Sequence, residues 1–341
     1  MKNARFALPL LFIGATHACE MMQYERVQAA PGVHVFQAAE GTTAVVNANI
    51  TAIVGSDAVM VVDTGQFPRI ARRVITDIRR ITPLPVRYVV NTHWHGDHLL
   101  ANAAFKEAFP EARFIAHSHS IREGARYYTD YAAQARTRLP VVVDDMKKRR
   151  EASTDDEEKL WLAKTLECVD EVLPQVEETT YLPPDQPMDG ELKLDLGGMP
   201  VVVKHIGSGN TPGDLVVWVE RARLVATGDI IVAPVPYAIG SNIEPWLATL
   251  GELRRMNAAI VVPGHGPVMR DDAYVRDVEA LLASTRTQLL ALQARGVSRA
   301  DAVTRLDTAP FRDKYLTTAM RRQAFDQFFV KVAIAAIWPK T

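Results

Sequence analysis

A run of seven residues, Thr92-His93-Trp94-His95-Gly96-Asp97-His98, constrains the fold of this chain more than any other feature. It closely follows residues 86–90, a short apolar stretch that is typical of a buried strand. Three imidazoles and a carboxylate can converge on one small volume here, because a turn after a strand presents consecutive side chains inward. Neutral imidazole and carboxylate are ligands that zinc accepts. The run therefore predicts a metal centre at the edge of a sheet.

The apolar pattern on either side of this run alternates between strand and helix. Strands are expected over residues 33–37, 44–54, 59–62, 86–90 and 113–116, and helices over residues 70–81 and 99–109. Further strands are expected over residues 191–196, 201–206, 215–219 and 223–226, and helical stretches over residues 271–294 and 312–337. This order indicates an α/β (α+β) protein.

Residues 118–182 interrupt the alternation, because they carry much helical signal and little strand signal. Thr154-Asp155-Asp156-Glu157 has the pattern of a capping box at a helix start. We therefore expect a helical insertion over this range. The mixed charges of residues 144–159 favour a solvated surface, and a substrate lid is the alternative.

The first residues have the features of a secretory signal peptide. Lys2 and Arg5 precede an apolar stretch, residues 6–15, and Thr16-His17-Ala18 places small residues before a cleavage position. We expect residues 1–18 to be removed after Ala18, which leaves Cys19 first in a periplasmic or secreted protein. Lipidation of Cys19 is the weaker alternative, because Thr16 and His17 differ from the residues that a lipobox prefers. No later segment reaches about 18 consecutive apolar residues, so no transmembrane anchor is predicted.

Cysteine content and charge restrict the possible functions. Cys19 and Cys168 are too few for a disulfide framework or a thiolate zinc site, and Cys168 has no identifiable partner or catalytic role. The chain has 39 Lys and Arg against 40 Asp and Glu, so it lacks the basic excess that nucleic-acid binding uses. We expect a small-molecule substrate and no nucleic-acid partner; the sequence leaves the oligomeric state open.

Five motifs together resemble those of the metallo-β-lactamase superfamily. In the order of the family they are Val61-Val62-Asp63-Thr64-Gly65, the Thr92–His98 run, Gly209-Asn210-Thr211-Pro212-Gly213-Asp214, Thr227-Gly228-Asp229 and Pro263-Gly264-His265-Gly266. The resemblance implies an αβ/βα four-layer sandwich over residues 19–341, in which residues 118–182 are the helical insertion and residues 271–341 a C-terminal helical extension.

The resemblance also implies a site for two zinc ions at one edge of the sheets. Its expected ligands are His93 and His95 for the first metal, Asp97, His98 and His265 for the second, and Asp229 for both. Asp63 would orient one of the histidines, as carboxylates behind metal ligands do, with a plain turn residue as the alternative.

Asn210 departs from the family pattern, which usually has a histidine there as the third ligand of the first metal. An amide oxygen binds zinc more weakly than imidazole, so we expect one tightly bound zinc and a second that binds weakly. His117, after the strand that ends at Ala116, is an alternative ligand. Because of Asn210, a metal-binding protein with a degenerate, catalytically weak or inactive site is the alternative to an enzyme.

The implied activity is zinc-dependent hydrolysis of a carbonyl-type bond. Zinc lowers the pKa of bound water to about 7, so a metal-bound hydroxide can attack the substrate at neutral pH. Asp97 would be the catalytic residue that orients this hydroxide and assists proton transfer. β-Lactams, lactones and thioesters are all candidate substrates. Tyr127, Tyr128 and Tyr131 are expected to pack within the insertion, with lining of a substrate pocket as the alternative. The stiff segment 234–237 is expected near the metal, where it could shape substrate entry.

Overall fold

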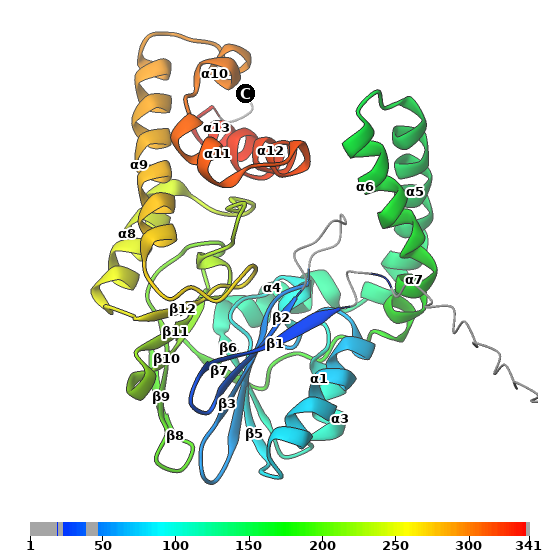
Figure 1. Ribbon diagram of the computed structural model, residues 1–341, viewed down its shortest axis with the longest axis vertical. Helices are drawn as coiled ribbons and strands as arrows, with labels where there is room; N and C mark the ends of the chain where they lie inside the picture. The colour runs from blue at the N-terminus through cyan, green and yellow to red at the C-terminus, as the bar shows by residue number, and fades with distance from the viewer. Residues whose placement is uncertain (1–18, 20–22, 39–46, 339–341) are drawn as a thin grey trace, which may run out of the picture.

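The computed structural model describes residue 19 and residues 23–38 and 47–338, and two facing β-sheets form its centre (Figure 1). The expected signal peptide and the start of the strand expected over residues 44–54 lie outside the described residues. The first sheet has the strand order β1 to β7, antiparallel from β1 to β4 and parallel from β4 to β7. Its strands are β1 (Tyr24–Ala30), β2 (Val33–Ala38), β3 (Ile50–Val54), β4 (Val59–Val62), β5 (Val86–Val90), β6 (Arg113–His117) and β7 (Gln186–Met188).

The second sheet has the strand order β12-β11-β10-β9-β8 and is antiparallel except for the parallel pair β11 and β12. Its strands are β8 (Glu191–Asp195), β9 (Pro200–His205), β10 (Leu215–Val219), β11 (Leu224–Ala226) and β12 (Ile260–Val262). Between the two sheets, Val35, Met60 and Val62 share one apolar core with Val203 and Val217. These strands are rich in valine because a β-branched side chain packs well on a pleated surface.

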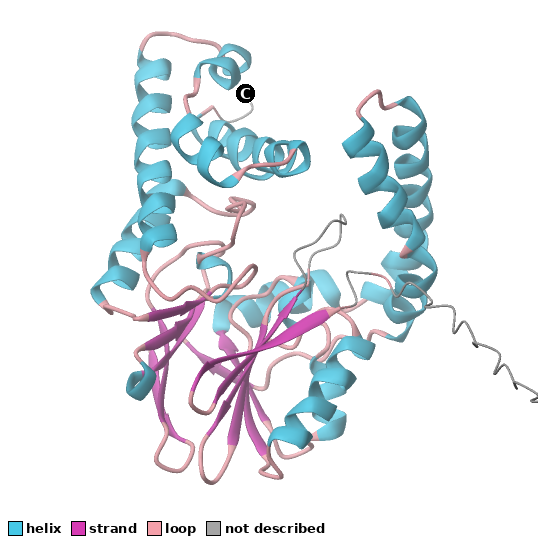
Figure 2. Cartoon of the chain, in the orientation of Figure 1, coloured by secondary structure: helices cyan, strands magenta, loops and turns pink. Residues whose placement is uncertain are grey.

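Helices cover the outer face of each sheet and complete four layers (Figure 2). The first sheet is covered by α1 (Pro68–Ile81) and α3 (Asn102–Ala108), and the second by α8 (Ile243–Arg255) and α9 (Ala273–Ala294). In α1, Ile70, Val74 and Ile78 recur at helical spacing and are buried. The αβ/βα sandwich expected from the sequence is therefore confirmed.

Two further groups of helices rise beyond one edge of the sheets (Figure 1). The helical insertion contains α4 (Ser118–Tyr128), α5 (Tyr131–Ala152), α6 (Asp156–Glu167) and α7 (Val169–Glu178). The N-cap of α6 is Asp155, whose side chain accepts from the backbone N–H groups of Glu157 and Glu158. The predicted cap at Thr154 was therefore one residue too early.

The second group of helices follows α9 near the C-terminus and contains α10 (Arg299–Arg305), α11 (Ala309–Tyr315), α12 (Ala319–Phe325), the π-helical turn η4 (Asp326–Val330) and α13 (Lys331–Ile337). The helical stretch expected over residues 312–337 is interrupted, because the chain turns at residues 316–318. Thr318 then caps α12, since its side chain accepts from the backbone N–H of Arg321. In the part of the chain that the structure describes, no helix is long and apolar enough to cross a membrane.

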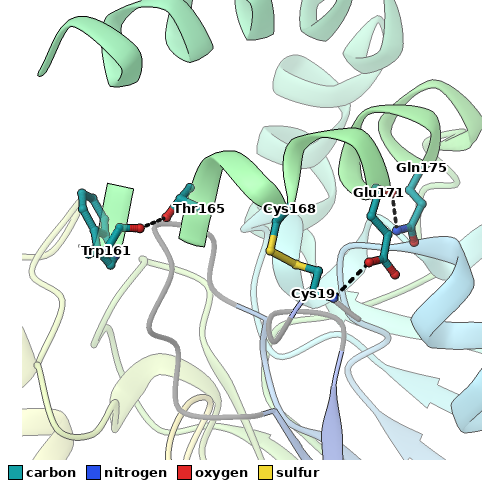
Figure 3. Close-up of a disulfide and its surroundings, with 6 residues drawn as sticks. All are labelled: Cys19, Trp161, Thr165, Cys168, Glu171 and Gln175. Carbon is teal, nitrogen blue, oxygen red and sulfur yellow. Dashed lines mark hydrogen bonds between the residues drawn. A yellow bond between two sulfur atoms is a disulfide. The ribbon is translucent and has the colours of Figure 1, made fainter. Parts of the chain in front are cut away.

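Cys19 and Cys168 form a disulfide, with their Cα atoms 5.2 Å apart (Figure 3). The expectation that Cys168 has no partner was wrong. The two cysteines are 149 positions apart, and only the folded chain places the N-terminal segment at the junction of α6 and α7. No local sequence pattern reports such a contact.

Candidate metal centre

The histidine-rich run lies between β5 and the short helix α2 (Gly96–Leu99), and buried side-chain amides hold it in place. The side-chain amide of Asn91 donates to the backbone carbonyl of His98 at 2.9 Å and to the amide oxygen of Asn102 at 3.1 Å. Asn102 donates back to Asn91 at 2.8 Å, and the Thr64 hydroxyl donates to Asn102 at 2.9 Å. Because every donor in this network is used, the loop is fixed before any metal binds.

Asp63 directly follows β4 and orients His98 by a hydrogen bond to Nδ1, on the far side of the ring from the cluster. One carboxylate oxygen accepts from the Thr92 backbone N–H at 2.8 Å, and the other accepts from the Thr92 hydroxyl at 2.9 Å and from His98 Nδ1 at 2.8 Å. Since a carboxylate only accepts, Nδ1 of His98 carries a proton, so the neutral form of this imidazole has its lone pair on Nε2. The expectation that Asp63 orients a histidine is confirmed.

Asp229 and His265 come from the second sheet. Asp229 lies in the short turn η3 (Gly228–Ile230) after β11, and a Cβ atom at Gly264 would lie 2.0 Å from its Oδ1 atom. Glycine at position 264 therefore makes room for the Asp229 carboxylate. His265 Nδ1 donates to the carbonyl of Asn47 at 3.0 Å. Its Nε2 atom then lies 3.0 Å from Asp97 Oδ2 and 3.3 Å from Asp229 Oδ1.

His93 and His95 complete the cluster. His93 Nε2 lies 3.0 Å from His95 Nδ1 and 3.8 Å from Asp229 Oδ2. Two groups of ligand atoms lie close enough to hold an ion, each within 4.8 Å: His93, His98 and Asp229, and Asp97, His98 and His265. Five of the six His and Asp ligands expected from the sequence belong to these groups, and His95 adjoins them through its 3.0 Å contact with His93. His98 belongs to both groups, whereas the sequence assigned it to the second metal alone.

Asn210 is buried and lines the same cavity as these ligands. The Asp214 carboxylate shapes its loop, accepting from the backbone N–H of Gly209 at 2.8 Å and from the hydroxyl of Thr211 at 2.6 Å. The Asn210 amide nitrogen donates to the carbonyl of Tyr237 at 3.0 Å, which fixes the orientation of the side chain. Its amide oxygen Oδ1 is buried and has no hydrogen-bond partner among the described residues.

The electrostatics of the cluster favour bound positive charge. Burial opposes charge on His265, yet the Asp229 and Asp97 carboxylates raise its pKa to about 9. Burial likewise opposes charge on Asp229, but His265 and His98 hold its pKa well below the usual range. Burial together with the neighbouring His98 and His95 lowers the pKa of His93, which keeps that imidazole neutral. Neutral imidazole and ionised carboxylate are the forms that bind a metal, so a bound metal would take the place of the protons that the carboxylates favour on His265 and His98.

Buried polar atoms without partners show that these residues fit a metal ion. His98 Nε2 and Asp229 Oδ1 lie 3.2 Å apart, and neither forms a hydrogen bond with another described residue. With His98 neutral, both atoms present lone pairs, as does the oxygen of Asn210. Buried polar atoms in proteins are nearly always hydrogen-bonded, so lone pairs that face one another indicate a cation between them. The donor set of imidazole and carboxylate suits zinc.

A cavity of about 680 Å³ opens above the cluster. His95, Asp97, Asn210, Asp229 and His265 line it together with apolar or aromatic side chains from three parts of the chain, namely Val235 and Tyr237, Tyr128 and Trp161, and Met320 and Phe328. Segment 234–237 was expected there, whereas for Tyr128 the favoured role was packing and the pocket was the alternative. The contributions of α6, α12 and η4 were missed, because helical periodicity does not report which helix packs over a distant site.

The carboxylate of Glu157 connects α6 and α12, two helices that line this cavity. Glu157, in the first turn of α6, accepts from the backbone N–H groups of Ala319 and Met320 at 3.0 and 3.3 Å. These groups begin α12, where backbone N–H groups have no partners within the helix. The helical insertion and the C-terminal helices therefore meet above the cluster.

His117 does not join the cluster. Its Nδ1 atom accepts from the backbone N–H of His119 at 3.0 Å, and its ring lies 4.7 Å from that of His205. Among the described residues, neither His117 nor His205 belongs to the two groups that could hold an ion. The structure therefore gives no support to His117 as a substitute ligand.

Two facing sheets with helices outside and a histidine–aspartate cluster at one edge define a mixed α/β protein with a candidate metal centre. Residues 43–265 match the sequence model of the family described as the metallo-beta-lactamase superfamily. The chain belongs to this superfamily, a class of metallo-hydrolases.

Similar proteins agree with this assignment. A linear primary-alkylsulfatase from a Pseudomonas species is 22% identical over 229 residues, which is 65% of this chain and 42% of that protein. The chain thus spans less than half the length of this curated relative. The fold resembles a metallo-beta-lactamase from Pontibacter korlensis at 17% identity, with a TM-score of 0.54 over 76% of this chain and 99% of that one. DIM-1 metallo-beta-lactamase gives 17% identity and a TM-score of 0.52 over 77% and 98%.

Proposed function

We propose that this protein is a zinc-dependent hydrolase that cleaves a carbonyl-type bond in a small molecule. The observation that carries the proposal is the set of buried polar atoms without hydrogen-bond partners on Asp229 and Asn210, which line the cavity, and on His98, which is buried beside Asp229. A centre of this kind would hold a divalent cation directly below a bound substrate. Zinc held there would acidify a water molecule and polarise the oxygen of the bond to be broken.

Asp97, His265 and Asp229 each have a separate role in the proposed hydrolysis. The side chain of Asp97 is 21% exposed, whereas that of Asp229 is 4% exposed. Asp97 therefore faces both the cluster and the cavity, where its carboxylate orients the attacking water and takes its proton. His265, 3.0 Å from Asp97, stabilises this carboxylate in its ionised form. Asp229 serves as a ligand in the group with His93 and His98, and its Oδ1 atom lies 3.3 Å from His265 of the other group.

The cavity favours a substrate with an apolar body. Polar groups lie at the floor, while Val235, Tyr237, Trp161 and Phe328 form much of the wall. A volume of about 680 Å³ lies in the range of pockets that bind drug-sized molecules. The similarity to an alkylsulfatase and to metallo-beta-lactamases supports a panel that contains alkyl sulfates and β-lactams as well as lactones and thioesters.

The test compares metal-depleted and zinc-reconstituted protein on this panel. We expect chelation to abolish hydrolysis and zinc to restore it, and Asp97→Asn to reduce the rate by at least 100-fold, the lower range for loss of a proton-transfer group. Asp57→Asn is the matched control, because Asp57 is an exposed carboxylate before β4. Full activity after exhaustive chelation would refute a metal-dependent hydrolase. Tight zinc binding without turnover of any substrate would support the degenerate site instead.

A further inference from the structure

Two atoms of Cys19 have their partners in the helical insertion (Figure 3). Its sulfur is bonded to that of Cys168, the residue between α6 and α7. Its main-chain nitrogen donates to Glu171 Oε2 at 3.1 Å. Glu171 lies in the first turn of α7, and Cys19 itself is only 8% exposed. The start of the described chain is therefore anchored by both its nitrogen and its sulfur.

We propose that Cys19 is the amino-terminal residue of the mature protein, held by an ion pair between its α-ammonium group and Glu171 and by the disulfide with Cys168. The sequence Thr16-His17-Ala18 before it carries small residues at the positions that a signal peptidase reads. The bond between Ala18 and Cys19 is then a processing site, and Cys19 and Cys168 are an oxidised pair. Both assignments are independent of the proposed hydrolysis.

Cleavage would strengthen the contact with Glu171. Hydrolysis of the bond between Ala18 and Cys19 consumes one water and leaves a carboxylate on Ala18 and an amine on Cys19. This amine is protonated at neutral pH, because an α-amino group has a pKa of about 7.7–8.0. The N–H of a neutral amide then becomes an ammonium donor to the same carboxylate. Hydrogen bonds between two charged groups are about twice as strong as neutral ones.

The disulfide is also incompatible with lipidation of Cys19. A lipidated cysteine carries its lipid on sulfur through a thioether, and a sulfur bonded in that way cannot join Cys168. Formation of the Cys19–Cys168 bond removes two electrons and two protons from the two thiols. A disulfide-bearing thiol oxidase accepts them and becomes a dithiol. Such bonds persist in oxidising compartments such as the bacterial periplasm, which supports export without a lipid anchor.

The first experiment measures the intact mass of the full-length chain after expression in a bacterium that exports it to its periplasm. The protein is treated with an alkylating reagent, with and without prior reduction. We expect the mass of residues 19–341 less two hydrogens, no alkyl group before reduction and two alkyl groups after it. Retained residues 1–18, a different first residue, an added lipid mass or two thiols alkylated without reduction would each overturn the proposal.

The second experiment tests the ion pair by the rate at which an amine reagent labels the α-amine of Cys19 near neutral pH. Glu171→Gln removes the carboxylate that stabilises the protonated α-amine, and only the unprotonated amine reacts. Labelling should therefore be about twofold to fivefold faster, the range for one partly exposed ion pair. Glu167→Gln is the control, because Glu167 is an exposed acid at the end of α6. Equal labelling of wild type and Glu171→Gln would refute the ion pair.

Discussion

The orientation of His98 by Asp63 leads to a strong prediction about metal binding. In Asp63→Asn the side chain keeps an oxygen that can accept from the backbone N–H of Thr92. The other position becomes an NH₂ group that faces His98 Nδ1, where the carboxylate now accepts at 2.8 Å. Two donors cannot bond, so the imidazole proton moves from Nδ1 to Nε2. Nε2 would then donate to Asp229, 3.2 Å away, and lose the lone pair that a metal needs.

The size of this effect follows from the contacts of Asp63. Its φ angle is 60°, which asparagine tolerates, so the substitution keeps the turn intact. The Thr92 hydroxyl can rotate and accept from the new NH₂ group, which leaves His98 as the residue affected. Loss of a partner behind a metal-binding histidine weakens metal affinity about 10–100-fold. This corresponds to about 1.4–2.7 kcal/mol of binding free energy.

The assay is competition for zinc between the protein and a chelator, with metal content measured after dialysis. We expect the Kd of Asp63→Asn to rise by at least tenfold. The control Asp57→Asn changes a carboxylate at the opposite end of β4 and should keep the wild-type Kd. Unchanged zinc affinity in Asp63→Asn would show that Asp63 does not set the His98 proton, or that His98 is not a ligand.

Three further predictions follow from the cluster and the disulfide. Asp97→Ala and His265→Ala should each lower the metal content of dialysed protein, measured by elemental analysis, and unchanged content in both would refute their assignment as ligands. Asn210→His should raise that content toward two zinc ions per chain, because imidazole is the stronger ligand; equal, tight binding of two ions by wild type and variant would contradict this. Cys168→Ser should lower the free energy of unfolding in denaturant titrations, by at most about 5 kcal/mol for a loop of 149 positions. An unchanged free energy would show that the disulfide does not constrain the unfolded chain.

Local patterns predicted the central sheets and the ligand-bearing loops well. Strands β4 and β5 were found with the correct ends, because a short run of valines bounded by turn residues has few alternatives. The pairing of Asp63 with a histidine followed from the family resemblance, and the structure identified the histidine as His98.

Features that depend on tertiary contacts were missed. The three-residue strands β7 and β12 are too short to show a period of two, and they exist because a neighbouring strand pairs with them. The break before α12 depends on Thr318 as a cap in a region of otherwise helical pattern. The Cys19–Cys168 bond and the cavity walls from α6 and α12 join segments far apart in sequence, so neither spacing nor composition could indicate them.

The Glu157 contact with α12 has a consequence for how proteins of this superfamily could diversify. The candidate ligands lie in loops and short helical turns at the sheet edges, whereas Glu157, Trp161 and Met320 lie on helices outside the four-layer core. Substitutions in these helices would reshape the cavity without moving a ligand, so selection could change substrate preference while the metal chemistry stays constant. Insertions and C-terminal additions are then the parts of the gene in which new specificities would arise, and ligand residues alone would be a poor guide to what a given chain hydrolyses.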